Sequence, residues 1–281
     1  MLKPIKELLS EELEDKLSKK ELLLLPSSYQ KIGNIVILNL KKELWKYDKA
    51  IGKIVLEKIP NTKSVFRRIG FIETQFRTPQ VKLISGVNNT ITTHREHGII
   101  YKLDIKNIMF SKGNLNERKR IIKQIKRGET VVDMFSGIGY FALGIAKFSE
   151  AKKIYAIEIN PKSYEYLVEN IRLNRVGSKV VPISGDCAVE IPKLGRIADR
   201  VIMGLLPSCK KYLKDAMKLV KPNGMTHYHG VAKKDENKLF EDVKTAAKIE
   251  GRKVRLIKKT KVKSYAPKVY HFVLDCKIIQ S

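Results

Sequence analysis

The chain has 281 residues, a length that fits one large domain or two modest ones. Lysine and arginine number 56 against 29 acidic residues, so the formal net charge is +27, while the 43% share of hydrophobic residues is ordinary for a globular core. No apolar run approaches the ~20 residues of a membrane span, and the N-terminus, which alternates Lys and Glu with Leu, is not expected to be a signal peptide, so a membrane protein is excluded.

The excess of positive charge favours a polyanionic partner, because Lys and Arg attract phosphates in a salt-dependent way. Nucleic acid is the leading candidate. A solvated basic surface without a partner is the alternative, and an anionic membrane is less favoured because no strongly amphipathic basic helix stands out. The three cysteines, Cys187, Cys209 and Cys276, have neither zinc spacing nor a disulfide framework, so we expect a cytoplasmic protein.

Residues 1–105 are predicted to form a small N-terminal α+β domain. Its expected elements are helices at 2–20 and 42–58 and strands at 34–40, 64–70, 81–86 and 91–104, the last with a bulge or turn at Gly98. Residues 106–128 form a junction, in which Asn114 or Asn116 caps a helix that runs to about Lys126. The loop at 111–114 would lie just before the first strand of the cofactor-binding domain, so it could fold over the ligand.

From residue 129 onward, strands and helices alternate. The expected strands are 130–135, 153–158, 179–184, 199–205, 225–231, 252–263 and 269–279, with helices at 139–148, 161–174, 187–193, 208–220 and 234–250. This alternation predicts a parallel sheet. The last two strands are joined only by residues 265–268, too few for a parallel crossover, so they must pair antiparallel. The predicted fold class is α/β, a Rossmann-like domain at 129–281 with a seven-stranded, mostly parallel sheet.

Residues 129–160 form the most informative βαβ unit. The first strand ends near Phe135 and turns through Gly137 and Gly139 into a helix, and the second strand ends on Glu158. Glycines let the backbone come close to a ligand, an approach that a Cβ would block. A carboxylate at the tip of the second strand can accept hydrogen bonds from both hydroxyls of a ribose. The acid stands 21 positions after Gly137, near the spacing of ribose-binding acids, so a nucleoside-type cofactor is predicted.

Two classes of nucleoside cofactor share this layout. A dinucleotide remains an alternative, because the third glycine of its fingerprint can be an alanine, here Ala142. Asp133 argues against it, since an acid at this place would face a pyrophosphate but suits the cationic amino group of S-adenosylmethionine. The pattern Asp133-x-Phe135-x-Gly137-x-Gly139 resembles the first motif of the class I S-adenosylmethionine-dependent transferases. A glycine turn without a ligand is the remaining alternative.

The third and fourth strand ends carry further candidates, because ligands of open α/β sheets lie at the carboxyl ends of the strands. Asp186 could accept the exocyclic amine of adenine while the Cys187 N–H donates to a ring nitrogen, although Asp186 could instead be only a helix N-cap. The fourth strand ends with Met203-Gly204-Leu205-Leu206-Pro207. It has no polar side chain there to accept hydrogens from an amine or ring nitrogen, so a base nitrogen is not the expected acceptor; a diverged methyltransferase loop is the alternative.

Histidines do not indicate a metal site. His94 and His97 would point to opposite faces of a strand, and His227 and His229 share a face but have no visible third ligand. No bound metal is therefore expected. No nucleophile-elbow pattern supports hydrolase chemistry either.

Several segments together resemble a family of archaeal tRNA-modifying enzymes. The segments are FSKGNLNER, VVDMFSGIGYFALGIAK, AIEINPKSYEYLVENIRLN and SYAPKVYHFVLDCKI, and the resemblance covers residues 60–281. The family acts at position 37, beside the anticodon, and has two branches: tRNA (guanine-N1) methyltransferases and wybutosine-synthesis aminocarboxypropyltransferases. The methyltransferase branch carries an Asn-x-Pro type motif after its fourth strand. Because this chain has Met203-Gly204-Leu205-Leu206-Pro207 there, it looks like the aminocarboxypropyl branch.

This resemblance implies transfer of the 3-amino-3-carboxypropyl group of S-adenosylmethionine to C7 of 4-demethylwyosine in tRNA(Phe), with release of methylthioadenosine. A guanine-N1 methyltransferase and a non-catalytic RNA-binding protein are the alternatives. It also implies that Ser111 and Arg118 hold the methionine arm. The expected cofactor-binding residues are Ser111, Arg118, Asp133, Phe135, Gly137, Gly139, Glu158, Ile159, Asp186, Cys187 and Gly204, and the expected substrate contacts are Arg67, Arg68, Arg77, Arg95, Leu206, Pro207, Tyr265, Tyr270 and His271. No catalytic base is identified, and a monomer is favoured.

Overall fold

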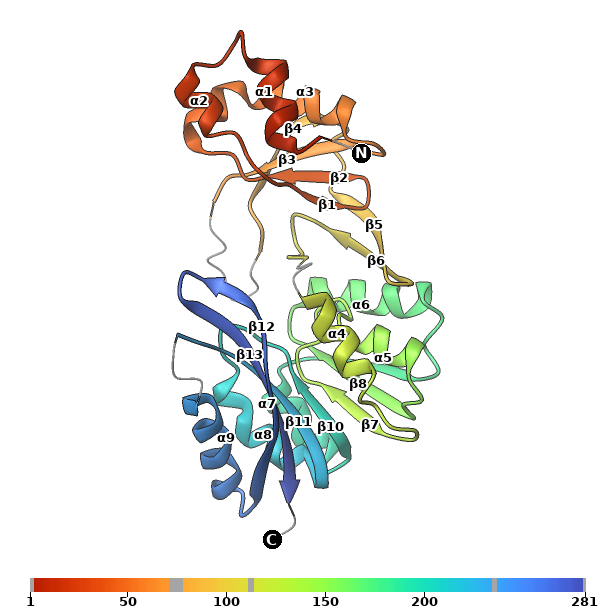
Figure 1. Cartoon of the computed structure of the whole chain (residues 1–281). Helices are drawn as coiled ribbons and strands as arrows, with labels where there is room; N and C mark the ends of the chain where they lie inside the picture. The colour runs from red at the N-terminus through yellow and green to blue at the C-terminus, as the bar shows by residue number, and fades with distance from the viewer. Residues whose placement is uncertain (1–2, 71–77, 111–113, 234–236, 280–281) are drawn as a thin grey trace. The chain divides into compact units, whose positions relative to one another are not determined.

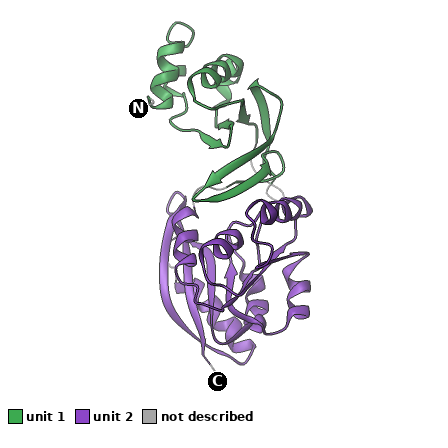
Figure 2. Ribbon diagram, turned by 90° about the vertical axis from the view of Figure 1, so that its right-hand side faces the viewer, with its two compact units in different colours: residues 1–110 green, residues 111–281 purple. Residues whose placement is uncertain are grey.

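The structure is a computed structural model, and it describes residues 3–70, 78–110, 114–233 and 237–279. The chain divides into two compact units, residues 1–110 and residues 111–281, shown in green and purple in Figure 2. The expected boundary at residue 105 lies close to this division. Within the expected junction, helix α4 (Leu115–Ile122) belongs to the second unit, where it packs against α5 (Ala142–Phe148).

Unit 1 is a small α+β structure. Its four-stranded sheet has the order β1 (Gln30–Ile32), β2 (Ile35–Leu38), β3 (Ser64–Arg68) and β4 (Val81–Gly86), and β5 (Ile91–Glu96) pairs with β6 (Ile99–Asp104) as a separate hairpin. A 3-10 helix, η1 (Lys42–Tyr47), leads into α3 (Asp48–Lys58). Residues of α1 (Ile5–Leu13), α3 and the inner strands form one apolar core. The turn predicted at Gly98 is confirmed, with φ of +78°.

The single helix predicted at 2–20 is wrong. The chain forms α1 and a second helix, α2 (Lys19–Leu23), instead. Ser18 begins α2 by accepting a hydrogen bond from the N–H of Glu21, whose side chain bonds back to the N–H of Ser18. This capping box fixes a new helix start, and the buried side chain of Leu17 anchors the link to the core.

Unit 2 carries the predicted seven-stranded sheet. Its elements after α4 are β7 (Thr130–Asp133), α5, β8 (Lys153–Glu158), α6 (Pro161–Leu173), β9 (Val180–Ser184), α7 (Cys187–Leu194), β10 (Ala198–Met203), η3 (Lys210–Tyr212), α8 (Leu213–Leu219), β11 (Val220–Ala232), α9 (Asn237–Ile249), β12 (Lys253–Ala266) and β13 (Val269–Ile279). The strand order is β12-β13-β11-β10-β7-β8-β9. Strand β13 pairs antiparallel with both β11 and β12, so the predicted antiparallel final pair is confirmed.

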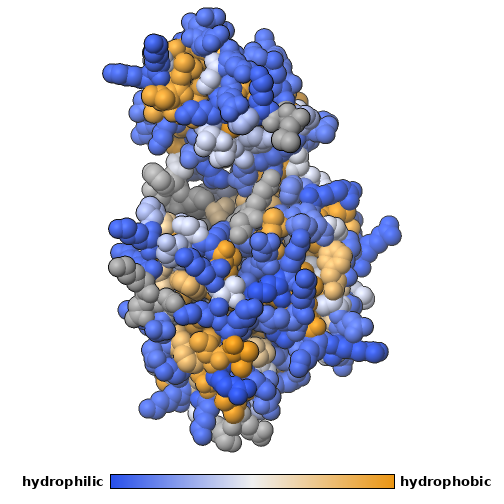
Figure 3. All heavy atoms as spheres, viewed as in Figure 1, coloured by the Kyte–Doolittle hydropathy of each residue, from blue (hydrophilic) through white to orange (hydrophobic). Residues whose placement is uncertain are grey.

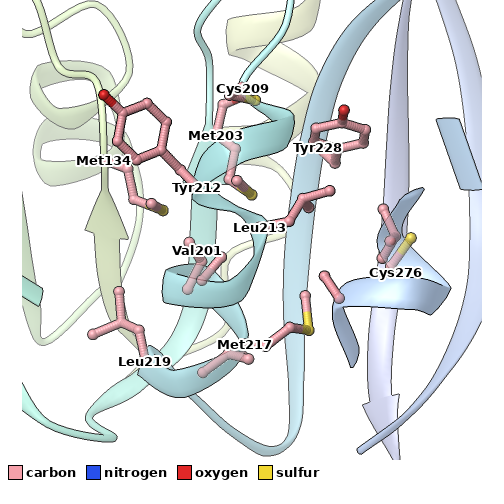
Figure 4. Packing of buried hydrophobic residues seen from close by; sticks show 14 of the residues in the cluster. Met134, Val201, Met203, Cys209, Tyr212, Leu213, Met217, Leu219, Tyr228 and Cys276 are labelled. Carbon is pink, nitrogen blue, oxygen red and sulfur yellow. The ribbon is translucent and has the colours of Figure 1, made fainter. Parts of the chain in front are cut away.

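The two faces of this sheet differ in chemistry. One face packs α7, α8 and α9 over an apolar core that includes Val201, Met203, Met217 and Tyr228 (Figure 4). The other face lies under α4, α5 and α6, which Figure 1 shows on the opposite side of the sheet. Because side chains alternate along a strand, the neighbours of the core residues point to this second face, and several of them are polar and buried.

Strand β12 forms one edge of the sheet and is largely exposed. Its exposed side chains include Lys258, Lys261 and Tyr265. Hydrophilic residues cover most of the viewed face of each unit in Figure 3. Among the helices of the described ranges, none is long and apolar enough to cross a membrane.

Candidate functional site

The turn between β7 and α5 requires its glycines. Gly137 and Gly139 have φ of +55° and +99°, in the left-handed region that side chains other than glycine rarely adopt. A Cβ on Gly137 would lie 2.7 Å from the ring of Tyr140, and one on Gly139 would lie 2.6 Å from Leu143 Cγ. The turn therefore brings a bare backbone to the carboxyl end of β7.

Glu158 closes this turn from the neighbouring strand. Its Oε2 accepts a hydrogen bond of 2.6 Å from the N–H of Gly137, and its Oε1 accepts one of 2.8 Å from the N–H of Asn160. The residue is 9% exposed, and burial raises the pKa of its carboxyl group, although backbone hydrogen bonds from Asn160, Gly137 and Ile159 act in the opposite direction. A carboxylate has about four acceptor positions, so acceptor capacity remains for a ligand.

Asp133 ends β7 and is fully buried. Its Oδ1 accepts a long hydrogen bond of 3.4 Å from the N–H of Phe135, and its Oδ2 has no hydrogen-bond partner among the described residues. Burial, with a smaller contribution from the charge of Glu158, raises the pKa of Asp133 to about 7. A buried oxygen without a partner is costly unless a ligand satisfies it, and a cationic ligand would also favour the ionised carboxylate.

The third strand end is tied to the second, because the N–H of Gly185 donates to the carbonyl of Glu158 at 3.0 Å. Asp186 caps α7, and its Oδ1 accepts a 2.9 Å hydrogen bond from the N–H of Ala188. The N-cap alternative is therefore realised, but it occupies one oxygen and leaves the other for a ligand. The thiol of Cys187 is buried, and burial raises its pKa, so only the backbone N–H of this residue suits the expected contact with adenine.

Arg118 reaches the glycine turn from α4. Its side chain is 7% exposed, and the guanidinium carbon lies 4.8 Å from the ring centroid of Tyr140, the residue that also borders Gly137. The structure thus brings Arg118 together with Asp133 and Glu158 around one turn. Ser111, its expected companion, lies outside the described residues.

The remaining predicted cofactor residues surround the same strand ends. Phe135 is half-buried and stands edge-on to Tyr212, with ring centroids 5.1 Å apart. Ile159 is 37% exposed at the end of β8. Gly204 follows β10, and a Cβ there would lie 3.1 Å from Phe141. Leu206 is half-buried and Pro207 exposed, so the loop after β10 is open to a substrate.

The predicted RNA contacts divide into accessible and inaccessible residues. Arg95 and Tyr265 are exposed, whereas Arg77 lies outside the described residues. Arg68 is half-buried and donates to Gln30, and Tyr270 lies under the ammonium of Lys261, 3.3 Å from the ring centroid.

Arg67 and His271 do not fit the predicted contact with RNA, because both side chains are buried. Arg67 is 5% exposed, bonded to Asp48 at 3.1 Å and stacked on Trp45, because its β-strand position faces the core of unit 1. His271 is 0% exposed, on the polar face of the unit 2 sheet. Neither side chain can contact RNA directly in this conformation.

Sequence reasoning missed a buried ion network under α4. It consists of Glu117, Arg120, Asp275, His227, Arg200 and Glu129. Arg120 Nη2 bonds Glu117 and Asp275 at 2.8 Å each, and Asp275 Oδ1 lies 2.7 Å from His227 Nδ1. Arg200 then joins His227 Nε2, at 2.7 Å, to Glu129, at 2.8 Å. Since Arg200 can only donate, His227 is neutral with its proton on Nδ1, and burial lowers its pKa.

A second missed feature is a pair of buried histidines, His229 and His271. The shared face of His227 and His229 on β11 was visible in the sequence, but their partners depend on the register between β11 and β13. His229 Nδ1 lies 3.1 Å from His271 Nε2. In the described ranges, no group of three or more His, Cys, Asp or Glu side chains could hold a metal ion.

Comparisons with known proteins identify both units. The model of the TRM5/TYW2 methyltransferase domain matches residues 92–257, and that of the TYW2 N-terminal domain matches residues 9–90. A tRNA(Phe) (4-demethylwyosine(37)-C(7)) aminocarboxypropyltransferase of Methanocaldococcus jannaschii is 43% identical over 251 residues, which cover 89% of this chain and 97% of that protein. A tRNA (guanine(37)-N(1))-methyltransferase Trm5b of Pyrococcus abyssi is 37% identical, covering 90% of this chain and 76% of its own.

A solved structure extends this likeness to the fold. The crystal structure of P. horikoshii TYW2 in complex with MeSAdo superposes with a TM-score of 0.84 at 35% identity, covering 98% of this chain and all of that one. The strand order and the similarity to this crystal structure therefore confirm the class I transferase fold that was predicted from the sequence.

Proposed function

This chain belongs to the TRM5/TYW2 family, and from that premise we propose that it transfers the 3-amino-3-carboxypropyl group of S-adenosylmethionine to C7 of 4-demethylwyosine at position 37 of tRNA(Phe). The observation that carries this proposal is the match of 43% identity along almost the whole length of an aminocarboxypropyltransferase. The sequence at the end of β10 agrees, because Met203, Gly204, Leu205 and Leu206 offer no side chain that accepts hydrogens from a guanine nitrogen.

In the proposed reaction, C7 of the nucleobase attacks the methionyl Cγ in line with the Cγ–S bond. The C7–Cγ bond forms while the Cγ–S bond breaks, its electron pair stays on sulfur, and methylthioadenosine leaves. C7 then loses its proton and the ring regains its aromatic electrons. The chain's main contribution is orientation: the methionine arm, rather than the methyl group, must face the acceptor, and positioning of this kind supplies much of a rate enhancement.

The site geometry supports a role for each strand end. Glu158 has free acceptor positions for the ribose hydroxyls, and Asp186 with the N–H of Cys187 suits the adenine edge. The orphaned oxygen of Asp133 suits the cationic amino group of the arm. Arg118, held over Tyr140 beside the glycine turn, suits the arm's carboxylate.

The decisive experiment uses S-adenosylmethionine labelled either in the methyl group or in the methionyl carbons, together with tRNA(Phe) bearing 4-demethylwyosine. We expect label from the arm in the tRNA and methylthioadenosine as the second product. Label from the methyl group, with S-adenosylhomocysteine, would identify the methyltransferase alternative. No incorporation of either label would identify a non-catalytic RNA-binding protein.

Asp133 gives a prediction about pH. Since its pKa is raised to about 7 in the free chain, part of the population carries a proton there near neutral pH, and binding of a cationic amino group should expel that proton. We therefore expect affinity for S-adenosylmethionine to increase as pH rises from 6 to 8. Calorimetry in buffers of different ionisation enthalpy should show proton release, and Asp133→Asn should abolish the release and weaken binding. Identical heats in all buffers would contradict this role.

We further propose that the anticodon region of the tRNA is bound by exposed basic and aromatic residues, including Arg95 and Tyr265, with the target base turned out of its stack.

The buried, unpaired cysteines support action in a reducing compartment, the cytoplasm.

A further inference from the structure

The histidine pair, His229 and His271, joins two neighbouring strands of the sheet. The inner nitrogens, His229 Nδ1 and His271 Nε2, are 3.1 Å apart, and the ring centroids are 5.1 Å apart. The two residues are 1% and 0% exposed. A hydrogen bond between two imidazoles requires one N–H and one bare nitrogen, so the pair holds one proton between its rings.

The outer nitrogens are unsatisfied. His229 Nε2 and His271 Nδ1 are buried and have no hydrogen-bond partner among the described residues. Because one inner nitrogen donates and the other accepts, one outer nitrogen carries a hydrogen and the other is a bare acceptor. Buried polar atoms without partners are rare, because each costs free energy. Where they occur, they indicate a group that takes a ligand or a proton.

The pair stays neutral at physiological pH. Burial lowers the pKa of both rings, that of His271 to about 4 and that of His229 well below its usual range. The charged and titratable groups that influence the pair from neighbouring positions are His227, Arg120, Asp275 and Lys263. The bare outer nitrogen therefore carries no proton at physiological pH.

The pair borders the loop after β10. The ring of Phe141 contacts His229, with centroids 5.5 Å apart, and the same ring would meet a Cβ on Gly204. The thiol of Cys209 donates to the carbonyls of both Met203 and His229, at 3.3 and 3.4 Å. His229 is thus held against the strand end where the acceptor base is expected.

We propose that His229 accepts the proton that C7 loses during the transfer, an inference that rests on the proposed function. The C7–H bond breaks and its electrons return to the ring, while the proton goes to His229 Nε2. The Nδ1–H of His229 then bonds His271 Nε2, so the second ring stabilises the positive charge. The nucleobase reaches Nε2 when the ring of Phe141 turns aside, and the proton passes to water when the product leaves.

A weak base suits this step. After C7 has formed its new bond, its hydrogen lies on a cationic or polarised ring and is strongly acidic. A base of low pKa removes such a proton and remains unprotonated between turnovers, whereas an ordinary histidine would be partly protonated near its usual pKa.

The test uses His229→Asn, whose amide can replace Nδ1 in the bond to His271 but offers no acceptor at the place of Nε2. Single-turnover rates are measured with tRNA whose acceptor carbon bears hydrogen or deuterium. We expect a loss of about 100-fold or more in rate and a primary deuterium isotope effect that is larger than in the wild type. His271→Gln, which keeps a partner at the place of Nε2, should lose less. His97→Asn, an exposed residue of unit 1, is the matched control and should keep the wild-type rate and isotope effect.

The melting temperature and the Kd for S-adenosylmethionine are measured for each variant, and His229→Leu, which also has no acceptor at the place of Nε2, replaces His229→Asn if the latter does not fold. A rate within threefold of the wild type, or a slow rate without an increased isotope effect, overturns the proton-acceptor role. Wild-type enzyme that forms no methylthioadenosine overturns the proposed function, and this inference with it.

Discussion

Replacing Glu158 by alanine is expected to weaken the binding of S-adenosylmethionine by about 100-fold or more. Two hydrogen bonds from ribose hydroxyls to a buried carboxylate are worth about 1.5–3 kcal/mol each, and about 1.4 kcal/mol is a factor of ten in Kd. The substitution also removes the acceptor for the N–H of Gly137, so the glycine turn loses its tie to β8. Isothermal titration calorimetry with purified protein measures the change in Kd directly.

Glu165→Ala is the matched control for this experiment. Glu165 lies on α6, a few residues after Glu158, but its side chain is 60% exposed and forms a surface ion pair with Lys162. Its removal should leave Kd within about twofold, since an exposed ion pair contributes little. Glu158→Gln distinguishes charge from shape, because its amide oxygen can still accept from Gly137. Unchanged affinity in Glu158→Ala would remove the ribose assignment.

The largest loss of stability is expected from Asp275→Ala. Asp275 is 2% exposed and lies at the centre of the buried ion network, where it accepts from Arg120 and His227. Its removal leaves the guanidinium of Arg120 buried beside Glu117 alone and takes the partner from His227. Breaking a buried pair in this way costs about 3–5 kcal/mol. Urea unfolding followed by circular dichroism measures the effect, and the fluorescence of Trp45, the single tryptophan, reports on unit 1.

The pH dependence of this loss has a definite sign. Burial alone would raise the pKa of Asp275. The hydrogen bonds from Arg120 and His227 outweigh this effect and hold the pKa well below its usual range. A carboxyl group whose pKa is lower in the folded chain than in the unfolded chain stabilises the fold at pH values above the unfolded pKa of about 4. This stabilisation is lost as the pH falls further. The difference between wild type and Asp275→Ala should therefore be full at pH 7 and shrink below about pH 4. Glu241→Ala, which removes a 61% exposed member of a surface pair on α9, should change stability by less than about 1 kcal/mol.

Local signals in the sequence were sufficient for the sheet and for the contact between the glycine turn and Glu158. The glycine turn and Glu158 lie within one βαβ unit, so their spacing alone predicts that they meet, and Glu158 does accept from Gly137. The short link at 265–268 likewise required an antiparallel pair. The helix predicted at 2–20 failed for a local reason as well, because the capping box at Ser18 and Glu21 outweighs the continuous pattern of leucines.

Contacts between distant segments could not be found in this way. Arg120 and Asp275 are 155 positions apart, and His229 and His271 are 42 apart. Their meeting depends on how β13 inserts beside β11 and how α4 lies on the sheet, neither of which leaves a periodic signal. Arg67 shows the same limit, since an arginine on a strand looks like a surface residue until Trp45 and Asp48 enclose it.

The exposed edge at β12 has a consequence for behaviour at high concentration. An unpaired strand edge can template the addition of a strand from another molecule, which is a route to fibrils. Here such an addition would bring Lys258 and Lys261 of one copy against the same ammonium groups of the next, and their mutual repulsion opposes the contact. The positive charge that attracts a polyanion therefore also discourages edge-to-edge aggregation, and added salt should weaken both effects together.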